Sequence, residues 1–125
     1  MNLEEIRRVI DRFAEDVNPG LLSCDLYDRD GFSIYGINSN PNHCSVFSHI
    51  TNMIKRSLEG TGFPRMEYYT IFAEENRMVL VVDLGGGYQF GAMIDRGKTT
   101  PGIVFSVALP RLIEDLKKLL PSGNG

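Results

Sequence analysis

The feature that most constrains this chain is an unbroken apolar run, Met78-Val79-Leu80-Val81-Val82, inside a stretch rich in strand-forming residues. A strand with one face in water alternates apolar and polar residues, so a run without alternation indicates a strand that is covered on both faces. Such a strand must lie inside a sheet, with helices packed on each side of it. The run therefore predicts a layered domain of helices and strands.

Two further strand patterns lie close to this run in the chain. Residues 66–73 precede it and residues 88–94 follow it, across the short connections Glu74-Glu75-Asn76 and Gly85-Gly86-Gly87. Connections this short join antiparallel neighbours, because a parallel pair needs a crossover of a dozen or more residues. We therefore expect a three-stranded antiparallel meander over residues 66–94.

The remaining patterns add a hairpin and three helices. Residues 21–27 and 32–37 are strand-like and flank the turn sequence Asp28-Arg29-Asp30-Gly31. Apolar residues recur at every third or fourth position, the helical period, within residues 3–17, 43–58 and 100–120. The predicted fold class is α/β (α+β), a five-stranded antiparallel sheet flanked by three helices in the order α-β-β-α-β-β-β-α.

The start of the last helix has two possible positions. Thr100-Pro101 offers an N-cap followed by a proline at the first helical position. Pro110 falls inside the apolar pattern, where it should kink the helix or restart it. Both positions stay open at this stage.

We expect residues 1–120 to form a single domain and residues 121–125 to form a disordered tail.

Composition narrows the classes of partner and compartment. The net charge is −3, and no stretch concentrates lysine and arginine as phosphate neutralisation requires, so nucleic acid is not an expected partner. The apolar runs are far shorter than the ~20 residues that span a bilayer. The chain also begins with acidic residues, Glu4 and Glu5, instead of a basic and then apolar leader. We expect a cytoplasmic protein without membrane insertion.

Sequence signals for catalysis or metal binding are weak. Cys24 and Cys44 fit neither zinc nor redox spacing, and we expect two reduced thiols, with a disulfide left open by the spacing. Cys44 follows His43 at a helix start, which favours a thiolate, but the sequence positions nothing to orient that histidine. The glycine triplet leads into a strand, not into the helix of a phosphate-binding loop. We nominate no catalytic, cofactor or metal residue and predict a protein that is not an enzyme.

The second helix carries a wider apolar stripe than packing on one sheet requires. The meander also leaves the strand at residues 66–73 at an edge of the sheet, and that strand has no proline or lysine to protect it. We predict an interface for a second copy or a partner here, and the alternative that the stripe is all core stays open. The residues we assign to it are Val46, Phe47, Ile50, Met53, Ile54, Tyr68, Tyr69 and Thr70.

The chain resembles the Roadblock family, which includes dynein light chains and longin-like GTPase-regulating modules. The resemblance rests on the element order, on Asp28-Arg29-Asp30-Gly31-Phe32, on Tyr68-Tyr69-Thr70-Ile71 and on the run from Met78 to Asp83. It implies that the first and third helices share one face of the sheet and that the second helix covers the other. It also implies dimerisation through the second helix and the third strand.

From this resemblance we expect a non-catalytic, homodimeric signalling module that binds and regulates a small Ras-like GTPase. A second hypothesis is a small-ligand-sensing or scaffolding domain of profilin-like type, whose sheet cups a metabolite. A third is an enzyme that uses Cys44 or the strand carboxylates Asp25, Asp83 and Asp95. A deep closed pocket over the sheet would favour the second hypothesis, and acids clustered in a cleft would favour the third.

Overall fold

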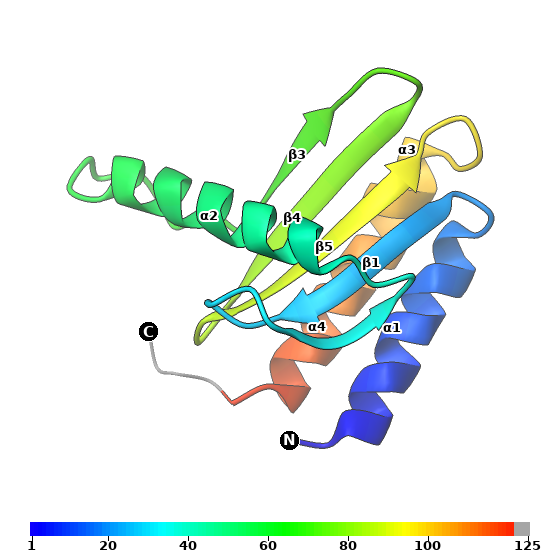
Figure 1. Cartoon of the computed structure of the whole chain (residues 1–125), viewed down its shortest axis with the longest axis horizontal. Helices are drawn as coiled ribbons and strands as arrows, with labels where there is room; N and C mark the ends of the chain where they lie inside the picture. The colour runs from blue at the N-terminus through cyan, green and yellow to red at the C-terminus, as the bar shows by residue number, and fades with distance from the viewer. Residues whose placement is uncertain (122–125) are drawn as a thin grey trace.

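A five-stranded antiparallel sheet in the order β2-β1-β5-β4-β3 organises the chain (Figure 1). The computed structural model describes residues 1–121, so most of the expected tail lies outside the described residues. The strands are β1 (Leu21–Tyr27), β2 (Ser33–Ile37), β3 (Tyr68–Phe72), β4 (Arg77–Gly85) and β5 (Tyr88–Asp95). The apolar run lies in β4, between β5 and β3, and residues 78–84 are all buried. The predicted double coverage of this strand is confirmed.

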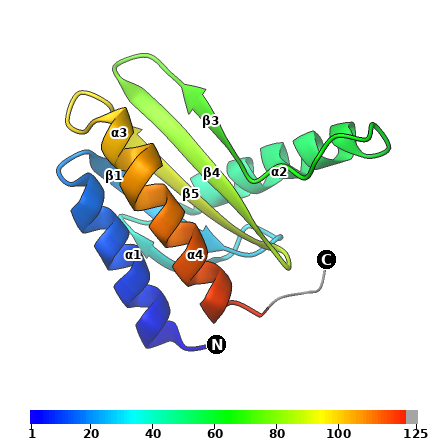
Figure 2. The ribbon, with the colours of Figure 1, turned by 180° about the vertical axis from the view of Figure 1, so that it is seen from behind.

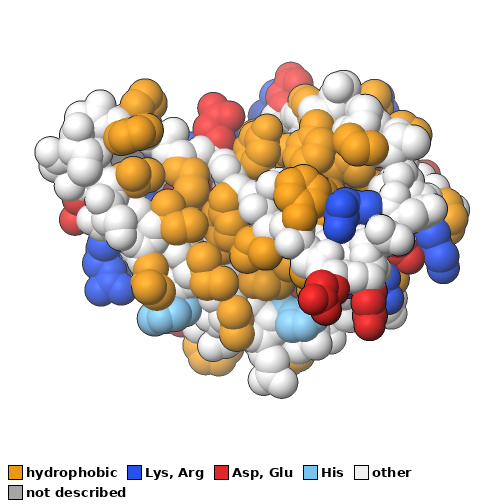
Figure 3. Space-filling view, turned by 90° about the horizontal axis from the view of Figure 1, so that it is seen from above, with side chains coloured by type: hydrophobic (Ala, Val, Ile, Leu, Met, Phe, Trp, Pro, Cys, Tyr) orange, Lys and Arg blue, Asp and Glu red, His pale blue; other side chains and the backbone are white. Residues whose placement is uncertain are grey.

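Helices cover the two faces of the sheet unequally. Helix α1 (Leu3–Val17) and the C-terminal helical stretch lie side by side on one face (Figure 2). Helix α2 (Pro41–Leu58) crosses the other face and runs out past the β3 edge (Figure 1). Seen from above, apolar side chains gather over α2 and the neighbouring end of the sheet (Figure 3). The predicted fold class, element order and distribution of helices over the faces are confirmed.

Helix α2 begins two residues earlier than the apolar period alone suggests. The side chain of Asn40 accepts hydrogen bonds from the backbone amides of Asn42 and His43, at 3.1 and 3.3 Å. Pro41 occupies the first helical position, where its missing N–H group has no helical partner to lose. The polar loop before the helix thus contains the N-cap.

The last helix runs without a break from Pro101 to Leu119, through α3 (Pro101–Ile103), the π-helical segment η1 (Val104–Ala108) and α4 (Leu109–Leu119). It starts at the Thr100 cap, whose side chain accepts a hydrogen bond from the amide of Ile103 at 3.3 Å. The amide of Leu109 reaches back to the carbonyl of Val104, one residue further than in an α-helix. This wide turn directly precedes Pro110, which has no backbone N–H group to donate to the preceding turn. The helix therefore continues through Pro110 and does not restart there.

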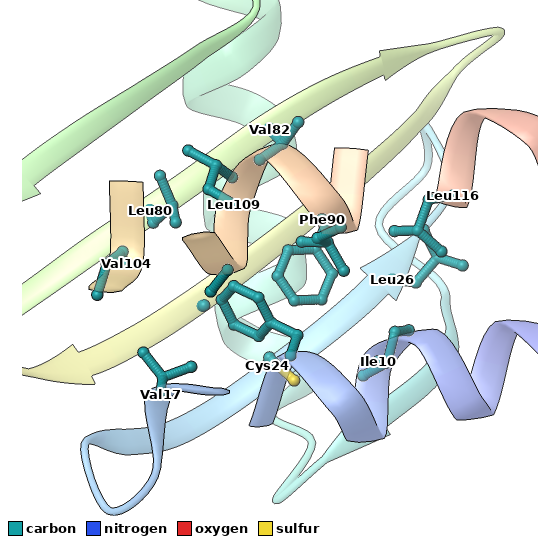
Figure 4. Close-up of a cluster of buried hydrophobic side chains, with 14 of the residues drawn as sticks. Ile10, Val17, Cys24, Leu26, Leu80, Val82, Phe90, Val104, Leu109 and Leu116 are labelled. Atoms are coloured by element: carbon teal, nitrogen blue, oxygen red, sulfur yellow. The ribbon is translucent and has the colours of Figure 1, made fainter. Parts of the chain in front are cut away.

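Two apolar cores lie on opposite faces of the sheet. The larger one joins α1, η1 and α4 to the sheet, and the rings of Phe13 and Phe90 meet edge to face with centroids 5.2 Å apart. Figure 4 shows this cluster, with Leu80 and Val82 of β4 among its members. The smaller core lies under α2 and contains Tyr27, Cys44, Phe47, Val79 and Val81. No helix within residues 1–121 is long and apolar enough to cross a membrane.

Both cysteines are buried free thiols, one in each core. Cys24 belongs to the larger core and Cys44 to the smaller one, so the sheet separates them and no disulfide joins them. Burial raises the pKa of both thiols from 9.0 to about 12, because a thiolate would lose its hydration. Cys44 is therefore held as a neutral thiol and not as a poised nucleophile.

We predict that neither cysteine of the folded protein reacts with iodoacetamide between about pH 7 and 9, whereas both react once the chain is unfolded. The folded chain keeps these two protons to higher pH than the unfolded chain does. The free energy of unfolding should therefore be undiminished below pH 9 and should fall as the pH rises from 9 toward 12. Mass spectrometry after timed labelling checks the first result, and urea titrations at several pH values check the second. Rapid labelling of the native chain at pH 8 would contradict the assignment.

Candidate functional site

Helix α2 is only partly supported by the sheet. Its buried residues, Cys44, Phe47, Ser48 and Thr51, all lie in the first eleven positions of the helix. Beyond Thr51 no α2 side chain is fully buried, and both ribbon views show this part of the helix extending beyond the sheet (Figures 1 and 2). The second half of α2 therefore carries apolar residues that the described chain covers only in part, with Met53 the most exposed of them.

We use the name α2–β3 surface for six residues, Val46, Ile50, Met53 and Ile54 of α2 with Tyr69 and Ile71 of β3. Val46 and Met53 are 52% and 49% exposed, and Ile71 is 39% exposed. Tyr69 and Ile71 share the face that α2 covers, because they pair with Val81 and Val79 of the smaller core. Figure 3 shows that apolar side chains form a continuous band on this side of the molecule. Contiguous exposed apolar surface of this kind marks interaction sites.

Three other residues of the predicted interface, Phe47, Tyr68 and Thr70, do not belong to the α2–β3 surface. Phe47 is 7% exposed and packs against Gly91 in the smaller core, beneath the α2–β3 surface. Tyr68 points to the opposite face of the sheet, where its ring stacks on Phe105 with centroids 6.3 Å apart. Thr70 follows the same alternation as Tyr68. The sequence prediction missed Ile71, although strand alternation from Tyr69 would have placed it on the same face.

Strand β3 is an open edge of the sheet. Within the described residues it pairs with β4 alone. The amide of Ala73 donates to the carbonyl of Arg77 at 2.8 Å, and the amide of Asp83 donates to the carbonyl of Glu67 at 2.9 Å. Hydrogen-bonded and non-bonded pairs alternate in an antiparallel ladder, so the odd-numbered residues of β3 bond to β4. The N–H and C=O groups of Tyr68, Thr70 and Phe72 therefore face outward.

A buried carboxylate ties the second half of α2 to the sheet. Asp83 of β4 is 3% exposed, and its Oδ2 lies 3.2 Å from Lys55 Nζ and 3.5 Å from a guanidinium nitrogen of Arg65. Arg65 also donates to the backbone carbonyl of Asp83 at 2.9 Å, and the amide of Gly85 donates to Asp83 Oδ1 at 3.1 Å. These contacts position the protruding helix and the loop that follows it.

The strand carboxylates do not form a common cluster. Asp25 accepts hydrogen bonds from Ser33, at 2.7 Å, and from Ser39. Asp95 pairs with Arg77 at 3.5 Å, and Asp83 pairs with its own two cations. Within residues 1–121 no three His, Cys, Asp or Glu side chains are placed to hold a metal ion. Each of these three carboxylates therefore has structural partners of its own.

Solved structures that share this fold include MglB proteins and Roadblock domains. MglB from Myxococcus xanthus superposes with a TM-score of 0.82 over 94% of this chain and 89% of that one, at 16% identity. A structure described as MglB with tetrameric arrangement gives 0.77 over 93% and 88%, at 14% identity. A Roadblock/LC7 domain from Streptomyces avermitilis gives 0.66 over 90% and 94%, at 14% identity. No family model matches the sequence, and no curated protein matches it. The chain thus has the Roadblock fold, as the sequence resemblance predicted.

We predict that Asp83→Ala lowers the free energy of unfolding by about 1–3 kcal/mol. Lys55 and Arg65 are about half exposed and can return to water, so the loss should be smaller than for two fully buried partners. Glu114→Ala is the matched control, because Glu114 pairs with Lys118 on the surface, where the loss should stay under about 0.5 kcal/mol. Urea unfolding followed by circular dichroism measures both variants. Equal losses would show that Asp83 does not anchor α2.

Proposed function

We propose that this chain is a homodimeric Roadblock-type module that binds a small Ras-like GTPase and regulates it. The observation that carries the proposal is the open β3 edge beside the exposed α2–β3 surface, on a Roadblock fold. An open edge strand is a template for pairing with another chain, and an exposed apolar patch favours association. A second copy meets both needs at once by continuing the sheet across a two-fold axis.

The GTPase partner rests on the family resemblance, since Roadblock-like modules include proteins that bind Ras-like GTPases. Regulation would act by positioning the GTPase's own groups, and no arginine of this chain is nominated as an arginine finger. Arg65 and Arg77 are engaged by Asp83 and Asp95, and Arg96 lies over the ring of Phe72 with its guanidinium carbon 5.0 Å from the ring centroid. These internal contacts favour structural roles for the three arginines.

We predict that Thr70→Pro disrupts the dimer but leaves a folded monomer, because the outward amide of Thr70 bonds to nothing within the described chain. Tyr69→Pro is the matched comparison. It removes an amide that faces β4, so it should lower the stability of the monomer itself. Sedimentation velocity and circular dichroism on both variants separate these effects. A Thr70→Pro protein that stays dimeric and has a native circular dichroism spectrum would show that β3 does not form the dimer interface.

We predict that Met53→Asp or Val46→Asp weakens dimerisation by about tenfold or more, because each places a charge in a desolvated contact. Val107→Asp is the control, since Val107 is similarly exposed, at 44%, but lies on the last helix, over the other face of the sheet. Phe47→Asp is a poor test, because Phe47 is part of the smaller core and its substitution would unfold the monomer. Light scattering over a concentration series distinguishes the dimer from the 14.0 kDa monomer. Equal effects of Met53→Asp, Val46→Asp and Val107→Asp would argue against the α2–β3 surface as the dimer interface.

The GTPase partner is tested by capture from the native host, with the immobilised dimer incubated in lysate that contains either GDP or a non-hydrolysable GTP analogue. We expect a small GTPase to be retained in a nucleotide-dependent manner and to be lost with the Met53→Asp or Thr70→Pro variant if binding needs the dimer. Single-turnover GTP hydrolysis by the captured GTPase then gives the sign of the regulation. Retention of no GTPase under either condition would refute the proposed partner.

A further inference from the structure

Strand β3 also carries aromatic side chains on the face of the sheet opposite α2, where α1 and the last helix lie (Figure 2). Tyr68 is 40% exposed, and Phe72, at the other end of the strand, is 62% exposed. Phe105 of η1 joins them, because its ring stacks on the ring of Tyr68. We use the name β3–η1 cluster for Tyr68, Phe72 and Phe105. The cluster adjoins the outward backbone groups of β3 and is therefore continuous with the open edge of the sheet.

Phe72 is held in a defined position although its ring is exposed. The guanidinium carbon of Arg96 lies 5.0 Å from the ring centroid, and Arg96 also donates to the carbonyl of Ala73 at 3.1 Å. A small, mainly apolar hollow of about 40 Å³ is lined by Phe72 and Phe105, so the chain does not fill the space between β3 and the last helix. Ordered aromatic rings of this kind are enriched in the cores of protein interfaces.

Strand spacing sets the room between the last helices of two joined copies. Neighbouring strands lie about 4.8 Å apart, so β4 of one copy and β4 of its partner would be separated by three spacings, about 14 Å. The last helix packs on β4 in each copy. Helices in direct contact have axes about 8–10 Å apart, so the remaining gap suits large side chains but not another helix. The aromatic rings of two β3–η1 clusters match a gap of this size.

We propose that the second copy also covers the β3–η1 cluster, so that the dimer interface has two sides and includes the last helix. This inference rests on the proposed homodimer and adds a contact on the face opposite α2. A strand added at β3 places alternate side chains on both faces of the sheet, so it brings its own cluster against the first. Interfaces of standard size use roughly 20–30 residues of each partner, many more than the six of the α2–β3 surface.

The chain contains no tryptophan, so Phe72→Trp introduces a single fluorescent reporter into the cluster. We expect its emission to move to shorter wavelength as the protein concentration rises, because the second copy removes the indole from water. The shift should follow the dimerisation curve that light scattering gives for the same variant. Val107→Trp is the matched control. Val107 is 44% exposed in η1 but points to a different side of the helix from Phe105, so its emission should not change with concentration.

Phe105→Leu tests the contribution of the last helix. Leucine keeps an apolar side chain at this partly buried position, so the monomer should stay folded by circular dichroism. We expect dimerisation to weaken by about fivefold or more, because a symmetric dimer loses the aromatic contact twice. Ile103→Leu is the control, since Ile103 is 41% exposed on the same helical stretch outside the cluster. Its dissociation constant should stay within about twofold of that of the unaltered chain.

The failure of this inference can be told apart from the failure of the dimer proposal. If the unaltered chain keeps a mass of 14.0 kDa at all concentrations, both are refuted. A second outcome refutes only the two-sided interface. In that case the unaltered chain dimerises and Thr70→Pro dissociates it, but the emission of Phe72→Trp does not depend on concentration and Phe105→Leu dimerises as tightly as Ile103→Leu.

Discussion

The burial of β4 on both faces is the constraint on which the rest of the structure depends. Alternate side chains of this strand enter the larger core, as Leu80 and Val82 do, or the smaller one, as Val79 and Val81 do. An apolar strand of this kind is stable only between two covering layers, which fixes where the helices must lie. Because α1 and the last helix together fill one layer, a single helix is left to cover the other.

That division leaves the α2 layer incomplete. The exposed α2–β3 surface and a polar pocket beside α2 both follow from it. One helix crossing a five-stranded sheet cannot cover it, so apolar side chains stay exposed on the side of α2 that meets β3. Where the helix extends past its apolar support, Lys55 is held by the carboxylate of Asp83 instead. The ion pair of Lys55 and Asp83 lies in the wall of the polar pocket beside α2.

Much of this architecture could be predicted from the sequence, because periodicity and turn length report directly on strands and helices. The unbroken β4 run and the short connections around it predicted the meander and the helices on both faces. The width of the α2 stripe predicted an exposed surface. It could not say which residues of the stripe are exposed and which are buried, because Phe47 and Val46 are neighbours and only the position of the sheet decides between them. The wide π-helical turn before Pro110 and the pocket were not predictable. The pocket depends on Arg29, Lys55 and Gln89, which only the folded chain brings together.

The direction of the backbone groups in β3 limits how two copies could be joined. In a symmetric antiparallel pair, outward-facing residues meet outward-facing residues, so the register can change only in steps of two residues. In the proposed dimer, a pair centred on the middle of the strand would place Thr70 opposite the partner subunit's Thr70. Tyr69 would then lie across from the partner subunit's Ile71 on the α2 side of the joined sheet. On the other side, Tyr68 would lie across from the partner subunit's Phe72, and a slip of one residue would lose all of these contacts at once.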